Sequence, residues 1–331
     1  MSVPELTRLT AALYELPAAA QRAENICSMV NFFPLAEQLM ECLTGLSRIV
    51  EIGSESGSNS MVLLQYAERR GIALETVDPV EPGNLAELSA SSHFTCCRIC
   101  SSDYLRLPRE VQVIFMDGDH NFETVLADLE AIDAARTQSG IQVVFLHDVS
   151  WPWARRDIYY NPEKIRAPHP YRNDLRVSPY DSGAASTGGL PAGNYATALR
   201  EGGDGNGVLT AVETFLSEAG TRWRFERFPV LYGVGVLYVP GNFNESELIL
   251  FEDVLNRLLS SRTLMAALEL NRVENLCRIE TLRQEIVHAG EIWKRDQSYI
   301  SELQTTLAER DKVIADSAEE WRRNQTYIAE L

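Results

Sequence analysis

The sequence lacks long hydrophobic runs, a basic leader and an excess of positive charge. It has no uninterrupted run of about 18 apolar residues, so we expect no transmembrane helix. Acidic residues come early and no basic segment precedes an apolar block, so we expect no signal peptide. Lys and Arg number 30 against 47 Asp and Glu, giving a formal net charge of -17. Such an acidic surface disfavours nucleic acids and anionic membranes as partners.

Cysteine is also scarce. Six cysteines in 331 residues are too few for a disulfide framework, and we expect a cytoplasmic protein. Cys96, Cys97 and Cys100 lie close together in the sequence and raise the question of a zinc site. They fall within or beside a β-rich run, and no second ligand pair follows at zinc spacing. We therefore favour a buried strand over a metal site there.

What the sequence does contain is an alternation of β-rich and helical segments. We expect residues 3–45 to form helices and the alternation to begin after them. Parallel strands joined by helices form a sheet that is covered on both faces, so the fold class is α/β, doubly wound and mostly parallel. The predicted strands are 47–53, 72–78, 93–99, 111–117, 141–148, 221–228 and 232–239, and the predicted helices between them are 58–70, 84–90, 122–136 and 207–219.

A long segment after the fifth strand, residues 149–206, interrupts this pattern. It is rich in Pro, Gly, Ser, Tyr and Trp, and a loop of this length within a domain is typical of a lid or substrate-binding insertion. Its aromatic rings could stack on sugars and its arginines could pair with an acidic group. Alternatively, the same side chains attach the lid to the domain. The candidate substrate residues are Trp151, Arg155, Arg156, Tyr159 and Tyr160.

The C-terminal segment contains an internal repeat. EIWKRDQSYISEL (291–303) recurs as EEWRRNQTYIAEL (319–331), an offset of 28 residues or four heptads. A heptad seam of this kind predicts a coiled coil and a homo-oligomer, although the companion seam is weaker and a single solvated helix is the alternative. The seam residues are Ile279, Ile286, Trp293, Ile300, Leu307, Ile314, Trp321 and Ile328.

The first strand ends in a glycine turn, EIGSESG (51–57), which precedes a helix. Such a turn lets a ligand approach the backbone, and the dinucleotide pattern GxGxxG is absent, so a nucleoside ligand is favoured over a pyrophosphate. Asp78, at the end of the second strand, could accept both hydroxyls of a ribose or could cap the turn before Pro79. Asp103 could reach an adenine amino group or could cap a short helix.

Acidic and histidine side chains follow the fourth and fifth strands. Asp117-Gly118-Asp119-His120 ends one strand and His147-Asp148 ends the other. Because the carboxyl ends of parallel strands border the ligand crevice, we expect these side chains to meet there. Oxygen and imidazole ligands suit Mg²⁺ or Mn²⁺, and a base at Asp119 or His120 could take a proton from a substrate hydroxyl. The alternative is that the acids cap loops and that His120 is a buried, hydrogen-bonded histidine.

The motifs VEIGSESGSNS, MDGDHNFETVLADLE and LHDVSWP resemble those of class I S-adenosylmethionine-dependent methyltransferases. The resemblance is to the bacterial branch of sugar O-methyltransferases and cephalosporin-hydroxylase-like proteins. It covers roughly residues 45–240, including RRDIYYNP and EGGDGNGVLTAVETFL. It implies a Rossmann-like fold with S-adenosylmethionine as cofactor. The implied cofactor-binding residues are Glu51, Gly53, Ser54, Gly57, Asp78, Ser102, Asp103 and Asp117.

The resemblance also implies a metal held by Asp117, His147 and Asp148, with Mg²⁺ or Mn²⁺ as the candidates. This sequence departs from the family pattern at Glu55, where a glycine is usual, and at His147, where an acid is usual. The implied function is O-methylation of a sugar hydroxyl in surface-polysaccharide or glycosylated-metabolite synthesis, with other proteins of polysaccharide synthesis as candidate partners. A hydroxylase-like or non-methylating enzyme and a coiled-coil scaffold with a relic domain are the alternatives.

The domain organisation follows from these segments. Residues 1–45 form a helical cap, residues 46–242 the methyltransferase domain including the insertion, and residues 243–331 the C-terminal helix and coiled coil. The acidic and histidine residues at the strand ends favour an enzyme over a relic.

Overall fold

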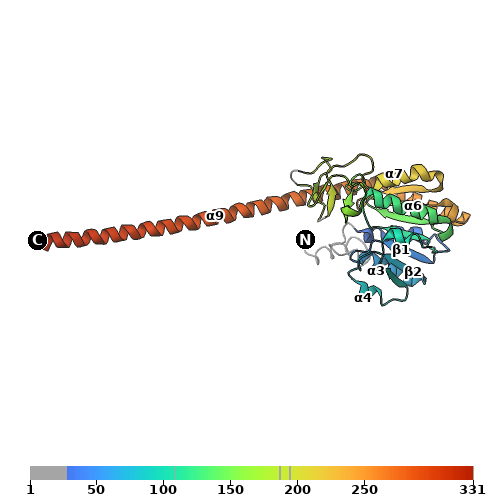
Figure 1. Cartoon of the computed structure of the whole chain (residues 1–331), viewed down its shortest axis with the longest axis horizontal. Helices are drawn as coiled ribbons and strands as arrows, with labels where there is room; N and C mark the ends of the chain where they lie inside the picture. The colour runs from blue at the N-terminus through green and yellow to red at the C-terminus, as the bar shows by residue number, and fades with distance from the viewer. Residues whose placement is uncertain (1–27, 108, 186–187, 194, 331) are drawn as a thin grey trace. The chain divides into compact units, whose positions relative to one another are not determined.

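The computed structural model describes residues 28–330 apart from 108, 186–187 and 194 (Figure 1). The helices predicted for residues 3–27 therefore lie outside the described residues. Contacts along the chain divide it into two compact units, the first ending at Cys277 and the second comprising residues 278–331. The first unit contains the central sheet and the helices that cover it.

The central sheet has seven strands in the order β11-β12-β5-β4-β1-β2-β3. The first five strands along the chain are parallel, whereas β12 runs antiparallel to both β5 and β11. This arrangement confirms the predicted Rossmann-like, doubly wound and mostly parallel α/β fold. The strands are β1 (Arg48–Ile52), β2 (Ala73–Val77), β3 (Phe94–Cys97), β4 (Val113–Met116), β5 (Val143–His147), β11 (Arg224–Phe228) and β12 (Val234–Tyr238).

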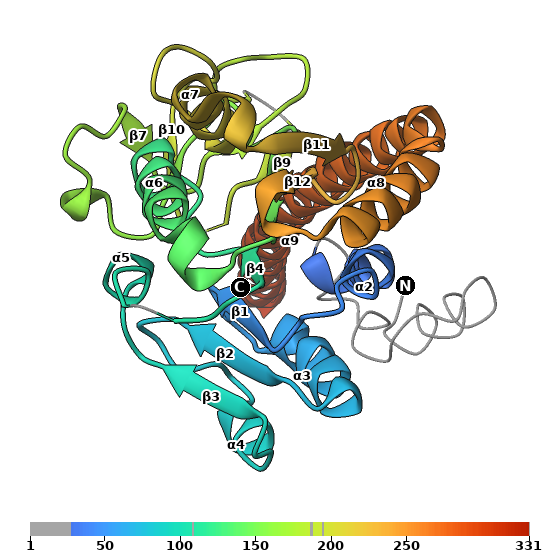
Figure 2. The same cartoon turned by 90° about the vertical axis from the view of Figure 1, so that its right-hand side faces the viewer.

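Helices cover both faces of the sheet, as Figure 2 shows. On one face pack η2 (Met29–Asn31), α2 (Phe33–Met40), α3 (Ser58–Arg70), α4 (Leu85–Leu88) and α8 (Glu245–Leu259). On the other face pack α5 (Ser101–Tyr104), α6 (Phe122–Ser139) and α7 (Val208–Ala219). The short turns η4 (Gly220–Arg222) and η5 (Pro240–Asn242) flank the last two strands.

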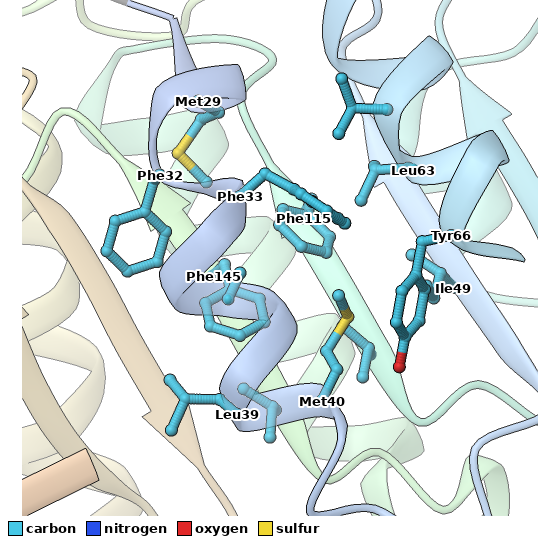
Figure 3. Close-up of a cluster of buried hydrophobic side chains, with 14 of the residues drawn as sticks. Met29, Phe32, Phe33, Leu39, Met40, Ile49, Leu63, Tyr66, Phe115 and Phe145 are labelled. Carbon is cyan, nitrogen blue, oxygen red and sulfur yellow. The ribbon is translucent and has the colours of Figure 1, made fainter. Parts of the chain in front are cut away.

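The strand sequences explain this layering. Successive side chains of a strand point to opposite faces, so a strand covered on both sides must be apolar throughout. In β5 the ring of Phe145 packs against Phe115 of β4, with centroids 4.8 Å apart. Its neighbours Val144 and Leu146 enter the core of the opposite face. Figure 3 shows the first of these cores, in which Phe32, Phe33 and Leu39 cover the sheet.

The insertion after β5 contains short strands that the sequence did not predict. They form a three-stranded sheet of order β6-β10-β7 and a two-stranded sheet of β8 and β9. Strands of two or three residues are too short to show a recognisable alternation of apolar and polar residues. They are β6 (Ile158–Tyr159), β7 (Tyr171–Arg172), β8 (Arg176–Val177), β9 (Leu190–Pro191) and β10 (Ala196–Ala198), with the helical turn η3 (Pro162–Lys164) after β6.

Two helices follow the sheet. In α8, Asn244 forms a capping box with Glu247, and Phe251 and Leu255 enter the core of the first face. Glu247 also accepts a hydrogen bond from the backbone N–H of Thr44, 2.7 Å away. Helix α9 spans Arg262–Glu330. The first unit thus extends past the predicted boundary at 242, because α8 completes its core.

None of the helices within the described ranges has the length and hydropathy needed to cross a membrane.

Candidate functional site

The glycine turn after β1 is shaped by close backbone approaches. Gly53 has a φ of 84°, and a Cβ added to it would lie 2.3 Å from the carbonyl oxygen of Asp117. Gly57 has a φ of 73° and precedes α3, where an added Cβ would lie 1.7 Å from Oδ1 of Asn84. No other residue type fits at either position without displacing its neighbours. The tip of β1 therefore lies directly against the tip of β4.

Glu55 occupies the position where the family pattern has its middle glycine. Its φ is 39°, in the region that favours glycine, and its side chain is exposed. The turn thus keeps a left-handed conformation at this position although the residue has a Cβ, at a conformational cost that the surrounding turn must offset.

Asp78, at the tip of β2, braces this turn. Its Oδ2 accepts a hydrogen bond from the backbone N–H of Ser54 at 2.9 Å, and its Oδ1 accepts one from Val80 N–H at 2.8 Å. The capping role is therefore observed. The predicted contact with a ribose stays a prediction, and a carboxylate retains lone pairs for it, because it can accept about four hydrogen bonds.

Glu51 lies inside the protein. It is 1% exposed, and its two oxygens accept hydrogen bonds from Asn59 Nδ2 and Ser60 Oγ in the first turn of α3. Burial raises the pKa of Glu51 to about 7. This side chain therefore fixes the start of α3 beneath the turn, and its contact with a cofactor stays a prediction.

Ser102 and Asp103 lie in the short helix α5 and are exposed. The N-cap of α5 is Cys100, so the alternative that Asp103 caps this helix is wrong. Asp103 forms an ion pair with Arg106 at 3.7 Å. Contact of these two residues with an adenine remains a prediction.

The acidic and histidine residues after β4 and β5 meet in one cluster, as predicted. Asp117 Oδ1 lies 2.8 Å from His147 Nδ1, and Asp148 Oδ2 lies 3.0 Å from His120 Nδ1. The two pairs are close, since His120 Nε2 lies 4.0 Å from Asp117 Oδ1. Asp117, His120 and His147 line a cavity of about 10 Å³ together with Ile52 at the tip of β1. This cavity has room for about one water molecule.

Opposite charges govern the titration of this cluster. Burial lowers the pKa of His147, but the charges of Asp117 and Asp148 outweigh it and raise the pKa to about 10. Burial also lowers the pKa of His120, but the charge of Asp148 outweighs burial, so that the pKa of His120 is raised. For Asp117, burial raises the pKa, but the neighbouring histidines hold it below its ordinary value. The cluster therefore consists of two carboxylate–imidazole pairs in which the carboxylates favour the charged form of each imidazole.

Asp148 is the most constrained member of the cluster. It is 4% exposed, its φ is 63°, and its Oδ1 has no hydrogen-bond partner among the residues that the structure describes. Left-handed backbone at a non-glycine residue and an unsatisfied buried oxygen both cost free energy, and both features concentrate at functional sites. Asp148 is thus fixed at the position where an added donor could bind.

The predicted metal set does not fit this geometry. Both ring nitrogens of His147 are already engaged, Nδ1 with Asp117 and Nε2 with the carbonyl oxygen of Leu231 at 2.7 Å. An imidazole needs a free nitrogen lone pair to bind a metal. In the part of the chain that the structure describes, no group of three or more His, Cys, Asp or Glu could hold a metal ion. The family's acid position is therefore filled here by a histidine that pairs with Asp117.

Two of the predicted substrate residues are instead structural. Arg156 is 1% exposed and donates hydrogen bonds to the carbonyl oxygens of Ala198 and Ser182 at 2.6 and 2.7 Å. Tyr159 is also 1% exposed and donates its hydroxyl hydrogen to Asp157 Oδ2 at 2.9 Å. Both side chains are buried and hydrogen-bonded within the insertion, a structural role of the kind that the sequence left open as the alternative.

The remaining insertion residues differ in their exposure. Arg155 forms two hydrogen bonds with Glu213 of α7, at 2.6 and 2.7 Å, and Trp151 packs partly buried against the core of the insertion. Tyr160 is 51% exposed, and its ring centroid lies 6.2 Å from that of His120. Tyr195, which the sequence did not single out, lies 4.8 Å from Tyr160. An aromatic pair thus borders the cluster.

Asp119 and Asp128 complete the acidic wall of the cavity. Asp119 accepts hydrogen bonds from His120 N–H at 3.1 Å and Thr124 Oγ1 at 3.2 Å, and burial raises its pKa. Burial also raises the pKa of Asp128 to about 7. The sequence did carry a signal for Asp128, because it falls between Val125 and Leu129 on the buried face of α6.

Residues 50–149 match the family model described as a methyltransferase domain. No curated protein matches the chain. The methyltransferase PaMTH1 of Podospora anserina is 15% identical with a TM-score of 0.40, and the similarity covers 72% of this chain and 87% of that chain. The O-methyltransferase TomG of Streptomyces achromogenes, involved in tomaymycin synthesis, is 13% identical with a TM-score of 0.38, covering 71% and 96%.

The matched segment runs from β1 to the residue after Asp148, so it includes the glycine turn and the histidine–aspartate cluster. Residues 50–149 are therefore similar to a methyltransferase domain, in agreement with the resemblance of the sequence motifs. The match names no branch of the family and no acceptor.

Proposed function

We propose that this protein is an S-adenosylmethionine-dependent methyltransferase that methylates a hydroxyl group of a sugar-containing acceptor. The observation that carries the proposal is the pairing of His120 with Asp148, 3.0 Å apart, next to the exposed ring of Tyr160. His120 provides a base for a hydroxyl proton, and the ring of Tyr160 provides a face on which a sugar ring can stack. Surface-polysaccharide or glycosylated-metabolite synthesis is the context that the resemblance implies.

The residues present fit the methyl donor. The turn between Gly53 and Gly57 exposes backbone at the start of α3, where a side chain would collide with Asp117 or Asn84. We propose that this turn and Asp78 hold S-adenosylmethionine, which when bound supplies an electrophilic methyl group on a sulfonium. The cluster at the tips of β4 and β5 adjoins the turn, because Gly53 contacts Asp117 directly.

His120 is the general base in this proposal. In its neutral form His120 donates its Nδ1 hydrogen to Asp148, which leaves Nε2 as the acceptor for a proton. The proton of the attacking acceptor hydroxyl would pass to Nε2, and the bound S-adenosylmethionine would supply the methyl group. Asp119 was the alternative base, but its oxygens already accept hydrogen bonds from His120 N–H and Thr124. It positions the loop that carries His120.

The proposal is tested with S-adenosylmethionine carrying a labelled methyl group and a panel of free hexoses, nucleotide-activated hexoses and glycosylated phenols. We expect label in an alkali-stable ether on a sugar, together with calorimetric binding of S-adenosylmethionine. Binding without transfer to any sugar would refute the acceptor class. Absence of binding would favour the non-methylating alternative on the same scaffold.

We further propose that residues 278–330 self-associate. The apolar seam recurs every seven residues from Ile279 to Ile328, and its side chains are 44–71% exposed. A stripe of this length with two tryptophans is stabilised when a second copy covers it. The scaffold alternative would make this association the whole function, whereas the intact cluster around Asp148 supports an enzyme with an added assembly segment.

A further inference from the structure

The turn between β11 and β12 contacts the tip of β5. Its Leu231 carbonyl oxygen lies 2.7 Å from His147 Nε2. Its Tyr232 carbonyl oxygen accepts a hydrogen bond from Ser150 N–H at 2.7 Å, and a Cβ added to Gly233 would lie 2.4 Å from Ser150 N. The turn therefore fixes one side of the imidazole whose other nitrogen pairs with Asp117.

This turn has an unfavourable backbone conformation. Leu231 and Tyr232 are consecutive non-glycine residues with φ values of 54° and 65°. Bulky side chains rarely adopt the left-handed region, and such a pair persists only where the surrounding structure holds it. The contacts with the end of β5 hold this turn from one side.

Glu269 of α9 holds the other side. Its Oε1 accepts a hydrogen bond from Tyr232 N–H at 2.9 Å. Arg272, one turn further along α9, forms an ion pair with Glu269 at 2.6 Å and places its guanidinium 4.6 Å from the centroid of the Tyr232 ring. Burial raises the pKa of Glu269, but the hydrogen bonds from Arg272 and from the backbone of the turn hold it below its ordinary value.

We propose that Glu269 is a positioning residue for methyl transfer, acting on the acceptor crevice through the turn. It fixes the strained backbone of Leu231 and Tyr232, the Leu231 carbonyl fixes the ring of His147, and that ring fixes Asp117 beside the base. The activity part of this inference rests on the proposed function, whereas the contact chain from Glu269 to His147 does not.

Helix α9 offers a matched control. Arg262, at its start, forms an ion pair with Glu226 of β11, in the same hairpin but away from the turn. A substitution at either Arg262 or Glu269 thus removes one charged contact between α9 and the hairpin. A purely structural role predicts similar effects of the two substitutions, whereas a positioning role predicts an effect on turnover from Glu269 alone.

The test compares the full-length variants Glu269→Leu, Glu269→Gln and Arg262→Gln. With the best acceptor of the sugar panel, we expect Glu269→Leu to lower kcat about tenfold and to leave both KM values within about twofold. Glu269→Gln keeps an acceptor oxygen for Tyr232 N–H and should restore most of kcat. Arg262→Gln should match the wild type. Wild-type kcat in a folded Glu269→Leu protein would overturn the positioning role.

A second measurement needs no methyl acceptor. In protein labelled with ¹⁵N-histidine, the exchange of the His147 Nε2 proton with solvent reports its hydrogen bond to Leu231. We expect this exchange to be about tenfold faster in Glu269→Leu than in the wild type, and an unchanged rate would overturn the inference even if the sugar assignment fails. Should Glu269→Leu not fold, Arg272→Met is the second variant, judged by the same two measurements.

Discussion

Nδ1 of His120 lies 3.0 Å from Oδ2 of Asp148, although the two residues follow different strands of the sheet. His120 comes from the loop after β4 and Asp148 directly follows β5. Because β4 and β5 are adjacent and parallel, their carboxyl ends present both side chains to one crevice. In the proposed mechanism this pair fixes the tautomer of neutral His120 in which Nε2 accepts the proton of a substrate.

We expect Asp148→Asn to lower turnover by roughly 100-fold, the scale of a general-base contribution. The amide cannot stabilise the imidazolium that forms when His120 takes a proton. Calorimetric affinity for S-adenosylmethionine should stay within about threefold, because the glycine turn is unchanged. Asp174→Asn, an exposed aspartate of the insertion, is the control and should have wild-type turnover. Wild-type turnover in Asp148→Asn would exclude the His120–Asp148 pair as the general base.

The pH dependence of turnover follows from the same pair. His120 must be neutral to accept a proton, and its neutral fraction falls as the pH falls through its pKa. Burial alone would lower this pKa, but the charge of Asp148 raises it above the ordinary histidine value of 6.5. The acid limb of kcat should therefore have its midpoint above pH 6.5. The residual activity of Asp148→Asn should show this limb at lower pH, and an unshifted limb would assign the titration to another group.

Gly53→Ala should destabilise the protein more than Gly71→Ala. Both positions have left-handed φ, 84° and 67°, so each substitution costs roughly 1–2 kcal/mol of backbone strain. Only at Gly53 does the new methyl group meet an obstacle, the Asp117 carbonyl oxygen at 2.3 Å, whereas nothing lies within 4 Å at Gly71. We expect a further loss of about 1–3 kcal/mol in Gly53→Ala. Urea unfolding of the two variants measures the difference, and equal losses would contradict the close approach.

Asp128→Asn should stabilise the protein above neutral pH. Burial raises the pKa of Asp128 from 3.8 to about 7, so the folded state holds a proton that the unfolded state releases. The stability from this group is complete below pH 3.8 and is lost as the pH rises through about 7. At pH 8 the variant should gain roughly 2–4 kcal/mol relative to the wild type. Urea unfolding at pH 5 and pH 8 should show the gap widening with pH, and a constant gap would count against a buried, protonated Asp128.

Self-association is tested by adjacent substitutions on α9. Ile300→Asp puts a charge in the apolar seam, whereas Ser301→Asp puts the same charge one residue away, outside it. We expect the first to lower the mass measured by light scattering toward that of one chain and the second to leave the wild-type mass. A wild-type protein that is itself monomeric at micromolar concentration would contradict the proposal.

The strands that build the crevice could be predicted from the sequence because each is a β-rich run followed by a polar residue at its tip. The bounds of α3, Ser58–Arg70, were predicted to the residue, since Gly57 and Gly71 mark its two ends. The convergence of Gly53 with Asp117 and of His120 with Asp148 followed from parallel strand order alone.

The rest depends on contacts that leave no pattern in the sequence. Arginine is almost never fully buried, so nothing predicted that Arg156 would lie inside the insertion with carbonyl oxygens as partners. Leu231 acts through its backbone carbonyl, which every residue carries. His147 was predicted to be a metal ligand for the same reason. The sequence does not indicate that its Nε2 is already bonded to the Leu231 carbonyl oxygen.

The antiparallel orientation of β12 determines which loop borders the histidine–aspartate cluster. Val234, its first residue, lies opposite His147, the last residue of β5. The loop that enters β12 therefore reaches the crevice, and the loop that leaves it ends on the opposite edge of the sheet. Residues gained or lost between β11 and β12 would reshape this side of the cluster without moving any strand out of register. Under the proposed function, such changes could alter the choice of acceptor without changing the glycine turn after β1.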